Sequence, residues 1–148
     1  MSGACNASIA VSAQGTKWDV LDPNEATATW VPILGIKTFA RNEVAPNVND
    51  ETTLESCYIE KSIGLPDAGQ VNLNMQYNRA DAGQKILQAA KSAGTQLTIR
   101  VTLTDGSTET VECFVMTFPY SGSANGGGLE GPVVLEVTGA PAWTEPTP

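Results

Sequence analysis

The stretch that decides the fold runs from residue 70 to residue 118 and reads QVNLNMQYNRADAGQKILQAAKSAGTQLTIRVTLTDGSTETVECFVMTF. Its first eight residues alternate strictly between polar and apolar side chains, with Val71, Leu73, Met75 and Tyr77 at the apolar positions. The polar positions carry only neutral amides, which are Gln70, Asn72, Asn74 and Gln76. This alternation predicts a strand with one buried face and one solvated, uncharged face.

The next segment predicts one helix, over residues 82–92. Asp81 is a suitable N-cap, and Gln84, three residues on, is its expected capping-box partner. Gly94 is expected to end the helix in the left-handed conformation. The apolar stripe of this helix is narrow, so the helix is expected to flank a sheet rather than to build a helical domain.

Two further strands, residues 96–104 and 108–118, predict a hairpin around Asp105-Gly106. A two-residue loop would pair Ile99 with Glu112 and would mix apolar and polar faces. A three-residue loop with Gly106 in the left-handed position keeps the apolar residues of both strands on one face. The three-residue loop is therefore the prediction.

Outside this stretch the pattern is less regular. The domain organisation predicted is an irregular N-terminal arm (1–28), a β-sandwich domain (29–139) and a Pro-rich C-terminal tail (140–148). Further strands are predicted at 29–39, 52–58 and 133–138, with polar loops at 40–50 and 60–69 and a Gly-rich loop at 120–132. The fold class predicted is mainly β, a β-sandwich or barrel with one flanking α-helix.

The composition excludes several classes of function. The 148 residues suit one domain, and sixteen acids against eight bases give a net charge of −8, which disfavours a protein that grips nucleic acid by its phosphates. Histidine is absent, which excludes His-based acid–base catalysis and the commonest metal ligand. No run approaches the ~20 apolar residues of a membrane span, and Met1–Gly15 has no Lys or Arg for a signal peptide. Neither membrane contact nor secretion is therefore expected.

The remaining residues that carry chemistry do not form a convincing site. The acid pairs Asp19/Asp22, Asp50/Glu51 and Glu109/Glu112 are expected in loops or on solvated strand faces. Cys5, Cys57 and Cys113 lack metal-binding spacing and are expected to be small, largely buried hydrophobes in a reducing compartment. Trp30 is expected in the core, with Trp18 and Trp143 anchoring the two terminal segments. No enzyme, cofactor or metal site is predicted.

The motifs of residues 28–142 resemble, in their order, the tail tube proteins (major tail proteins) of long-tailed, non-contractile bacteriophages. They are Trp30-Val31-Pro32-Ile33, Gly35-Ile36-Lys37, Thr52-Thr53-Leu54, Gly64-Leu65-Pro66-Asp67-Ala68-Gly69, Asp81-Ala82-Gly83-Gln84, Asp105-Gly106, Phe114-Val115 and Val137-Thr138-Gly139-Ala140-Pro141. The resemblance implies a small β-sandwich with one helix. It also implies a virion protein, assembled in the host cytoplasm, whose hexameric rings stack into a hollow tube. The implied partners are other copies of the chain, tail terminator, tape measure and baseplate or tail-tip proteins, and DNA that passes transiently and without specific binding.

This resemblance assigns candidate surfaces rather than a catalytic site. The amide face of residues 70–76 is expected to line the lumen or to contact a neighbouring subunit, because a neutral or acidic wall lets DNA pass. The candidate inter-subunit loop residues are Arg41, Glu43, Asn47, Asp50, Leu65, Asp67, Ser121, Asn125, Gly127 and Leu129. Two alternatives stay open: an Ig-like binding or decoration module, which would stay monomeric, and a subunit of a type VI secretion-like tube.

Overall fold

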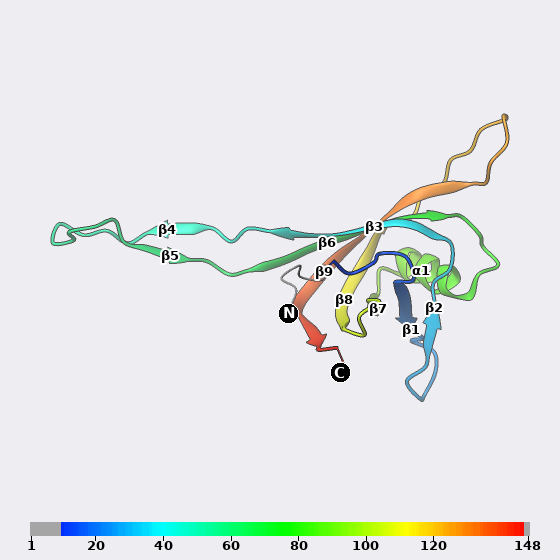
Figure 1. Ribbon diagram of the computed structural model, residues 1–148, viewed down its shortest axis with the longest axis horizontal. Coiled ribbons are helices and arrows are strands. Elements are labelled where there is room, and N and C mark those ends of the chain that lie inside the picture. Colours follow the sequence, from blue (N-terminus) through cyan, green and yellow to red (C-terminus); the bar gives the residue numbers. More distant parts are fainter. Residues whose placement is uncertain (1–9, 147–148) are drawn as a thin grey trace, which may run out of the picture.

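A computed structural model describes residues 10–146, and most of them belong to one antiparallel sheet. Its seven strands follow the order β2-β1-β7-β8-β9-β6-β3, and one helix, α1 (Ala82–Ala93), packs beside them (Figure 1). The strands are β1 (Lys17–Leu21), β2 (Trp30–Pro32), β3 (Ile36–Val44), β6 (Asp67–Gln76), β7 (Gln96–Thr102), β8 (Thr108–Thr117) and β9 (Glu130–Thr144). The predicted mainly-β class with one helix is confirmed.

The core lies on one face of this sheet, under α1. Val71, Leu73 and Met75 of β6 are at most 1% exposed, as the alternation of residues 70–77 predicts. Alternate side chains of β7, β8 and β9 are buried on the same face of the sheet. Leu87 of α1 packs onto this face and is itself 0% exposed. Because successive side chains of a strand point to opposite faces, the amides of β6 lie on the outer face.

The sheet curls until its two sides meet. β1 is second and β3 is last in the strand order, yet the rings of Trp18 on β1 and Phe39 on β3 are in edge-to-face contact, with centroids 5.6 Å apart. The core is therefore enclosed by one strongly curved sheet in the manner of an open barrel, and α1 covers one opening.

The ends of α1 match the prediction, but Gln84 acts differently from it. Asp81 caps the helix by accepting from Gln84 N at 3.1 Å, and Gly94 ends it at φ +69°. The Gln84 side chain does not complete a capping box. It is buried, accepts from the backbone of Asn78, and donates to the carbonyl oxygens of Leu34 and Gln76. Gln84 thereby fastens α1 to the β2–β3 connection and to the end of β6.

The hairpin of β7 and β8 has the predicted three-residue loop. Ile99 pairs with Val111 and Leu97 with Cys113, and Gly106 takes φ +95°. The Cys113 thiol is buried, and this burial raises its pKa to about 12. Glu109 lies two residues before Val111 on the same strand, so its side chain points to the same face and is buried. The prediction that Glu109 lies on a solvated face is therefore wrong.

The prediction of an irregular N-terminal arm is wrong for residues 17–21. These residues form β1, which pairs with both β2 and β7 and buries Trp18 and Val20 in the core. Trp18 is thus a core residue, whereas Trp30 is half-buried beneath the Arg100 guanidinium, 4.4 Å from the ring centroid. Residues 1–9, including Cys5, lie outside the described residues, so that part of the arm prediction and Cys5 are not tested.

Two other boundaries differ from the prediction. β9 continues to Thr144, so most of the predicted C-terminal tail is strand, and Trp143 near its end is 54% exposed. Residues 52–58 are irregular, with a turn at 54–55 and a bend at 57–58, rather than the predicted strand. Instead, β4 (Val48–Asp50) and β5 (Lys61–Ile63) pair with each other within the predicted loops 40–50 and 60–69, and Cys57 between them is exposed.

Candidate assembly surfaces

The outer face of β6 carries the four predicted amides, Gln70, Asn72, Asn74 and Gln76, in a row. Gln70 and Gln76 are exposed, and Asn72 and Asn74 are half-buried between the neighbouring strands β3 and β9. Gln70 Nε2 donates to Glu136 Oε2 on β9 at 2.8 Å. The amides therefore form one polar surface with the side chains of the adjoining strand.

This surface is negatively charged. On β6, β9 and β8, which are neighbours in the sheet, three glutamates point outward and no base does: Glu112, Glu130 and Glu136. Gln96 on β7 donates to Glu112, and Lys37 at the edge pairs with Glu130 at 2.7 Å. The same face also exposes Phe114 and Met116 on β8, so its β8 side is partly apolar.

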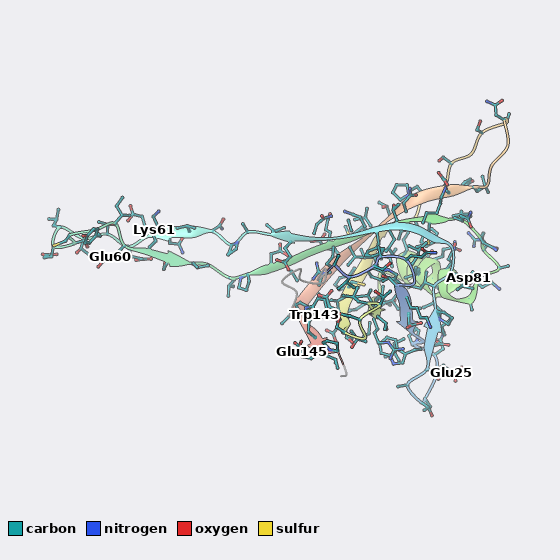
Figure 2. The ribbon with its side chains drawn as sticks, viewed as in Figure 1. Glu25, Glu60, Lys61, Asp81, Trp143 and Glu145 are labelled. Atoms are coloured by element: carbon teal, nitrogen blue, oxygen red, sulfur yellow. The ribbon has the colours of Figure 1, made fainter. Side chains whose placement is uncertain are left out.

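The most conspicuous feature is a projection that we call the β-arm, residues 45–66. It contains β4 and β5 and extends far from the sheet along the longest axis, and these two strands contact no other element that the structure describes (Figure 1). Figure 2 shows Glu60 and Lys61 on the β-arm, remote from Asp81 at the start of α1. The β-arm contributes nothing to the core, because no buried core residue lies between Ile33 and Val71.

The β-arm exposes an unusual amount of apolar surface. Its large apolar side chains are 61–103% exposed, and they are Val48, Leu54, Tyr58, Ile59, Ile63 and Leu65. Large clustered apolar surfaces mark interaction sites in soluble proteins. Leu65 alone of this set is among the inter-subunit residues predicted from the sequence, because the others follow no strand or helix period.

The β-arm is also acidic, with Asp50, Glu51, Glu55 and Glu60 against Lys61. None of these groups takes part in an ion pair among the described residues. Hydrogen bonds from the Thr52 side chain and backbone lower the pKa of Asp50, so this carboxylate stays charged.

The predicted loop residues divide between the β-arm and its root. Asn47 and Asp50 lie on the β-arm with Leu65, while Glu43 and Asp67 are exposed at its root. At this root, a Cβ on Gly69, which has φ +84°, would collide with the Asn42 carbonyl oxygen. Only glycine therefore allows the two strands to approach this closely.

Arg41 is the exception, because it points into the molecule. Its guanidinium donates to the carbonyl oxygens of Ala68 and Asn42, and its Nε lies 3.5 Å from Oε1 of the buried Glu109. Burial raises the pKa of Glu109, and the Arg41 charge opposes that rise. Arg41 is thus a partly buried structural group of β3, and its role as an inter-subunit contact stays a prediction.

A second projection connects β8 to β9. Ser121 forms an isolated bridge with Glu130 at its base, while Asn125 and Gly127 lie exposed at its tip and Leu129 is 46% exposed. The ring of Tyr77 contacts Phe118 and Tyr120 beneath it, with centroids 5.7 and 4.8 Å apart. This loop therefore stands on an aromatic base and presents small polar residues.

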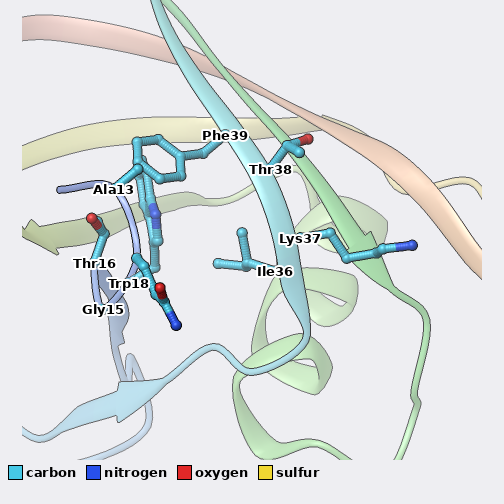
Figure 3. A pocket seen from close by; sticks show the side chains of 9 residues that line it. Ala13, Gly15, Thr16, Trp18, Ile36, Lys37, Thr38 and Phe39 are labelled. Carbon is cyan, nitrogen blue, oxygen red and sulfur yellow. The ribbon is translucent and has the colours of Figure 1, made fainter.

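Both edges of the sheet are unpaired in the part of the chain that the structure describes. β2 pairs only with β1, and β3 only with β6. Between the two sides lies an open cavity of about 680 Å³, lined by residues around Thr16, Trp18 and Ile36–Phe39 (Figure 3). Open edges favour aggregation unless another chain pairs with them or covers them.

Within residues 10–146, no helix is long and apolar enough to cross a membrane. No cluster of three or more His, Cys, Asp or Glu side chains is placed to hold a metal ion in the same range.

The comparisons with known proteins agree on the fold. The tail of an empty gene transfer agent particle matches with a TM-score of 0.72 at 18% identity, over 92% of this chain and 100% of that chain. The SPP1 tail tube matches with a TM-score of 0.65 at 16% identity, over 90% of this chain and 78% of that chain. An anti-feeding prophage baseplate structure matches with a TM-score of 0.67 at 12% identity, over 94% and 97%. At these identities the likenesses show a shared fold.

No curated protein sequence matches the chain. The family model described as phage tail tube, TTP, lambda-like, matches residues 9–124, which is most of the chain. The resemblance read from the sequence motifs is confirmed. The chain belongs to the lambda-like phage tail tube protein family and is a structural protein of the virion tail.

Proposed function

We propose that this chain polymerises as stacked hexameric rings into the hollow tail tube through which phage DNA is delivered. The observation that carries the proposal is the β-arm, whose large apolar side chains are 61–103% exposed and whose strands contact no other element within residues 10–146. Burial of apolar surface is the main favourable contribution to protein association. The unpaired edge strands β2 and β3 also support the proposal, because neighbouring copies can cover them. The sixfold symmetry of the similar gene transfer agent tail supports a ring of six.

The amide row of β6 and the glutamates beside it form the proposed wall of the lumen. DNA carries one negative charge per about 1.7 Å of its axis, and clustered bases would hold it by releasing its counterions. The outer face of β6, β9 and β8 carries three outward glutamates and no outward base, so the proposed wall repels DNA and lets it move. The apolar pair Phe114 and Met116 on β8 favours a subunit contact at that side of the face.

The partners follow from this role. Other copies of the chain come first, joined through the β-arm, the sheet edges and the β8–β9 loop. The tail terminator, tape measure and baseplate or tail-tip proteins are the proposed partners at the ends and inside of the tube. No catalytic activity is part of the proposal.

Electron microscopy of the purified, concentrated chain is the direct test. We expect hollow tubes of uniform bore, with six subunits around the axis in rotational averages. Addition of the tail-tip proteins should shorten the lag before tubes appear, because an initiating surface removes the need to form the first ring. A chain that stays monomeric with and without those proteins overturns the proposal and restores the binding-module alternative.

The lumen assignment has a separate test. The double variant Gln70→Lys/Gln76→Lys places two bases on each copy on the proposed wall, at positions that are already exposed. Tubes of this variant should retain double-stranded DNA in a co-sedimentation assay, and the retention should fall steeply with salt. Wild-type tubes should not retain DNA. Equal DNA retention by both proteins means that this face lies away from the channel.

A further inference from the structure

We infer that Asn125 is a site of spontaneous deamidation, at which the backbone nitrogen of Gly126 attacks the side-chain amide. The site lies in the loop that connects β8 to β9 and projects from the sheet (Figure 1). The inference concerns the free chain, so it goes beyond the proposed function and does not depend on it. Three features carry it: the residue that follows Asn125, the hydrogen bonding of the two reacting groups, and the freedom of the loop.

The first feature is the sequence around the site. Asn125 is the only one of the nine asparagines that precedes a glycine. Ring closure requires the backbone nitrogen of the next residue to reach Cγ of the asparagine, and a Cβ on that next residue hinders the approach. Glycine has no Cβ. Asn47 is also exposed, but it precedes Val48, whose branched side chain is stiff.

Both reacting groups are free of competing hydrogen bonds. Asn125 and Gly126 are exposed. Within residues 10–146, the Asn125 side chain forms no hydrogen bond, and the backbone N–H of Gly126 donates to no acceptor. The backbone N–H of Asn125 donates to Ser123 Oγ at 3.3 Å, which leaves the side chain unaffected. The attacking nitrogen and the attacked carbonyl carbon are therefore both available.

The loop is free to bring these two groups together. Gly126 and Gly127 have φ +104° and +85°, and a Cβ built on either meets nothing within 4 Å. Chains rich in glycine behave as flexible coils, and loop motions take nanoseconds to microseconds. These motions are far faster than a covalent reaction of an amide. The loop therefore samples the geometry of attack repeatedly before the reaction occurs.

The Asp105-Gly106 step of the β7–β8 hairpin shows how the fold prevents the corresponding reaction. The Gly106 N–H donates to the Leu103 carbonyl oxygen at 3.0 Å. The Asp105 carboxylate accepts from the Ser107 backbone N–H at 2.9 Å and from its hydroxyl at 2.6 Å, and these bonds lower the pKa of Asp105. An ionised carboxylate has no good leaving group, so this step should stay unreacted in the folded chain.

The proposed reaction consumes only water. A bond forms between the Gly126 nitrogen and Cγ of Asn125, and the side-chain nitrogen leaves as ammonia with the proton that the Gly126 nitrogen loses. Water then opens the resulting succinimide at either carbonyl, to give aspartate or isoaspartate. In isoaspartate the main chain runs through the former side chain. Either product adds one negative charge to the loop, which is a surface proposed to contact other copies.

Peptide mapping by mass spectrometry tests the site in the free chain, aged at mildly alkaline pH below the concentration of assembly. The peptide that contains Asn125 should accumulate aspartate and isoaspartate about tenfold or more faster than the peptide that contains Asn47. Isoaspartyl methyltransferase, which labels isoaspartate, should label the aged wild-type chain. Labelling should fall to background in Asn125→Gln, whose longer side chain would have to close a larger ring. Circular dichroism confirms that this variant folds.

The chain unfolded in guanidinium is the control for the role of the fold. There the Asp105-Gly106 step should also form isoaspartate, because the hairpin hydrogen bonds are lost, whereas the rate at Asn125 should change little. If Asn125 reacts in the unfolded chain but not in the folded one, the fold protects the loop and the inference is wrong. Equal conversion of Asn125 and Asn47 in the folded chain overturns it as well. Neither result bears on the proposed function, since no step of the test requires tubes.

Discussion

Replacement of residues 45–66 by an Asn-Gly turn should give a folded monomer that no longer forms tubes. The strand ends that the turn would join, Val44 and Asp67, are already paired, and Asn-Gly suits a two-residue hairpin. No core residue is lost, and β4 and β5 contact no other element, so the free energy of unfolding should change little. The deletion removes the six exposed apolar side chains, so the main surface proposed for association is lost. Sedimentation velocity and electron microscopy measure the result.

The matched control keeps the β-arm at full length and charge but replaces Leu54, Tyr58 and Ile59 with serine. This variant should also fail to assemble if burial of its apolar tip drives association, whereas a purely mechanical role for the projection would leave tubes intact. Normal tubes from the deleted chain contradict the role given to the β-arm.

The elements predicted correctly are those that local patterns determine. The alternation of residues 70–77 reports burial of one face, the parity of apolar residues around Gly106 sets the hairpin register, and Asp81 and Gly94 cap their helix through neighbouring backbone groups. Each of these signals lies within a few residues of the structure that it determines.

The β-arm could not be predicted in this way. Its large apolar side chains are mostly exposed in the described part of the chain, so burial imposes no period of two or of 3.6 on them. The β-prone residues at 52–58 predict a strand there. The residues that do pair as strands are 48–50 and 61–63. Both lie in segments that are polar or that have glycine and proline close by, so neither segment predicts a strand. An element that is proposed to pack against another molecule leaves only its composition as a signal in the sequence.

The ion pair of the partly buried Arg41 and the buried Glu109 shows a different limit of prediction from sequence. The hairpin register places Glu109 on the face of Val111 and Cys113, so its burial follows from sequence parity. Its partner comes from β3, which is far away in the sequence and separated from β8 by β9 and β6 in the sheet, and the curvature of the sheet brings the two side chains together. Arg41 therefore looked like a loop residue in the sequence.

Arg41→Met should lower the free energy of unfolding by about 3–5 kcal/mol at pH 7.5, because removal of one partner leaves a buried charge uncompensated. The loss should be smaller at pH 5. Burial raises the pKa of Glu109 above its ordinary value of 4.5, and without Arg41 the pKa rises further. Between 4.5 and the raised value, the folded protein binds more protons than the unfolded one, so stability falls as the pH increases. Urea unfolding at both pH values, below the concentration of assembly, measures the difference.

The double variant Arg41→Met/Glu109→Gln is the control for this pH dependence. It removes both charges and keeps side chains of similar size, and replacing a buried ion pair by uncharged groups is often nearly neutral. Its unfolding free energy should return towards the wild-type value, and the extra pH dependence of the single variant should disappear. If the single variant loses the same free energy at pH 5 and pH 7.5, the cost comes from lost packing and from the hydrogen bonds to Ala68 and Asn42 instead. The charge of Glu109 would then play no part in holding the root of the β-arm.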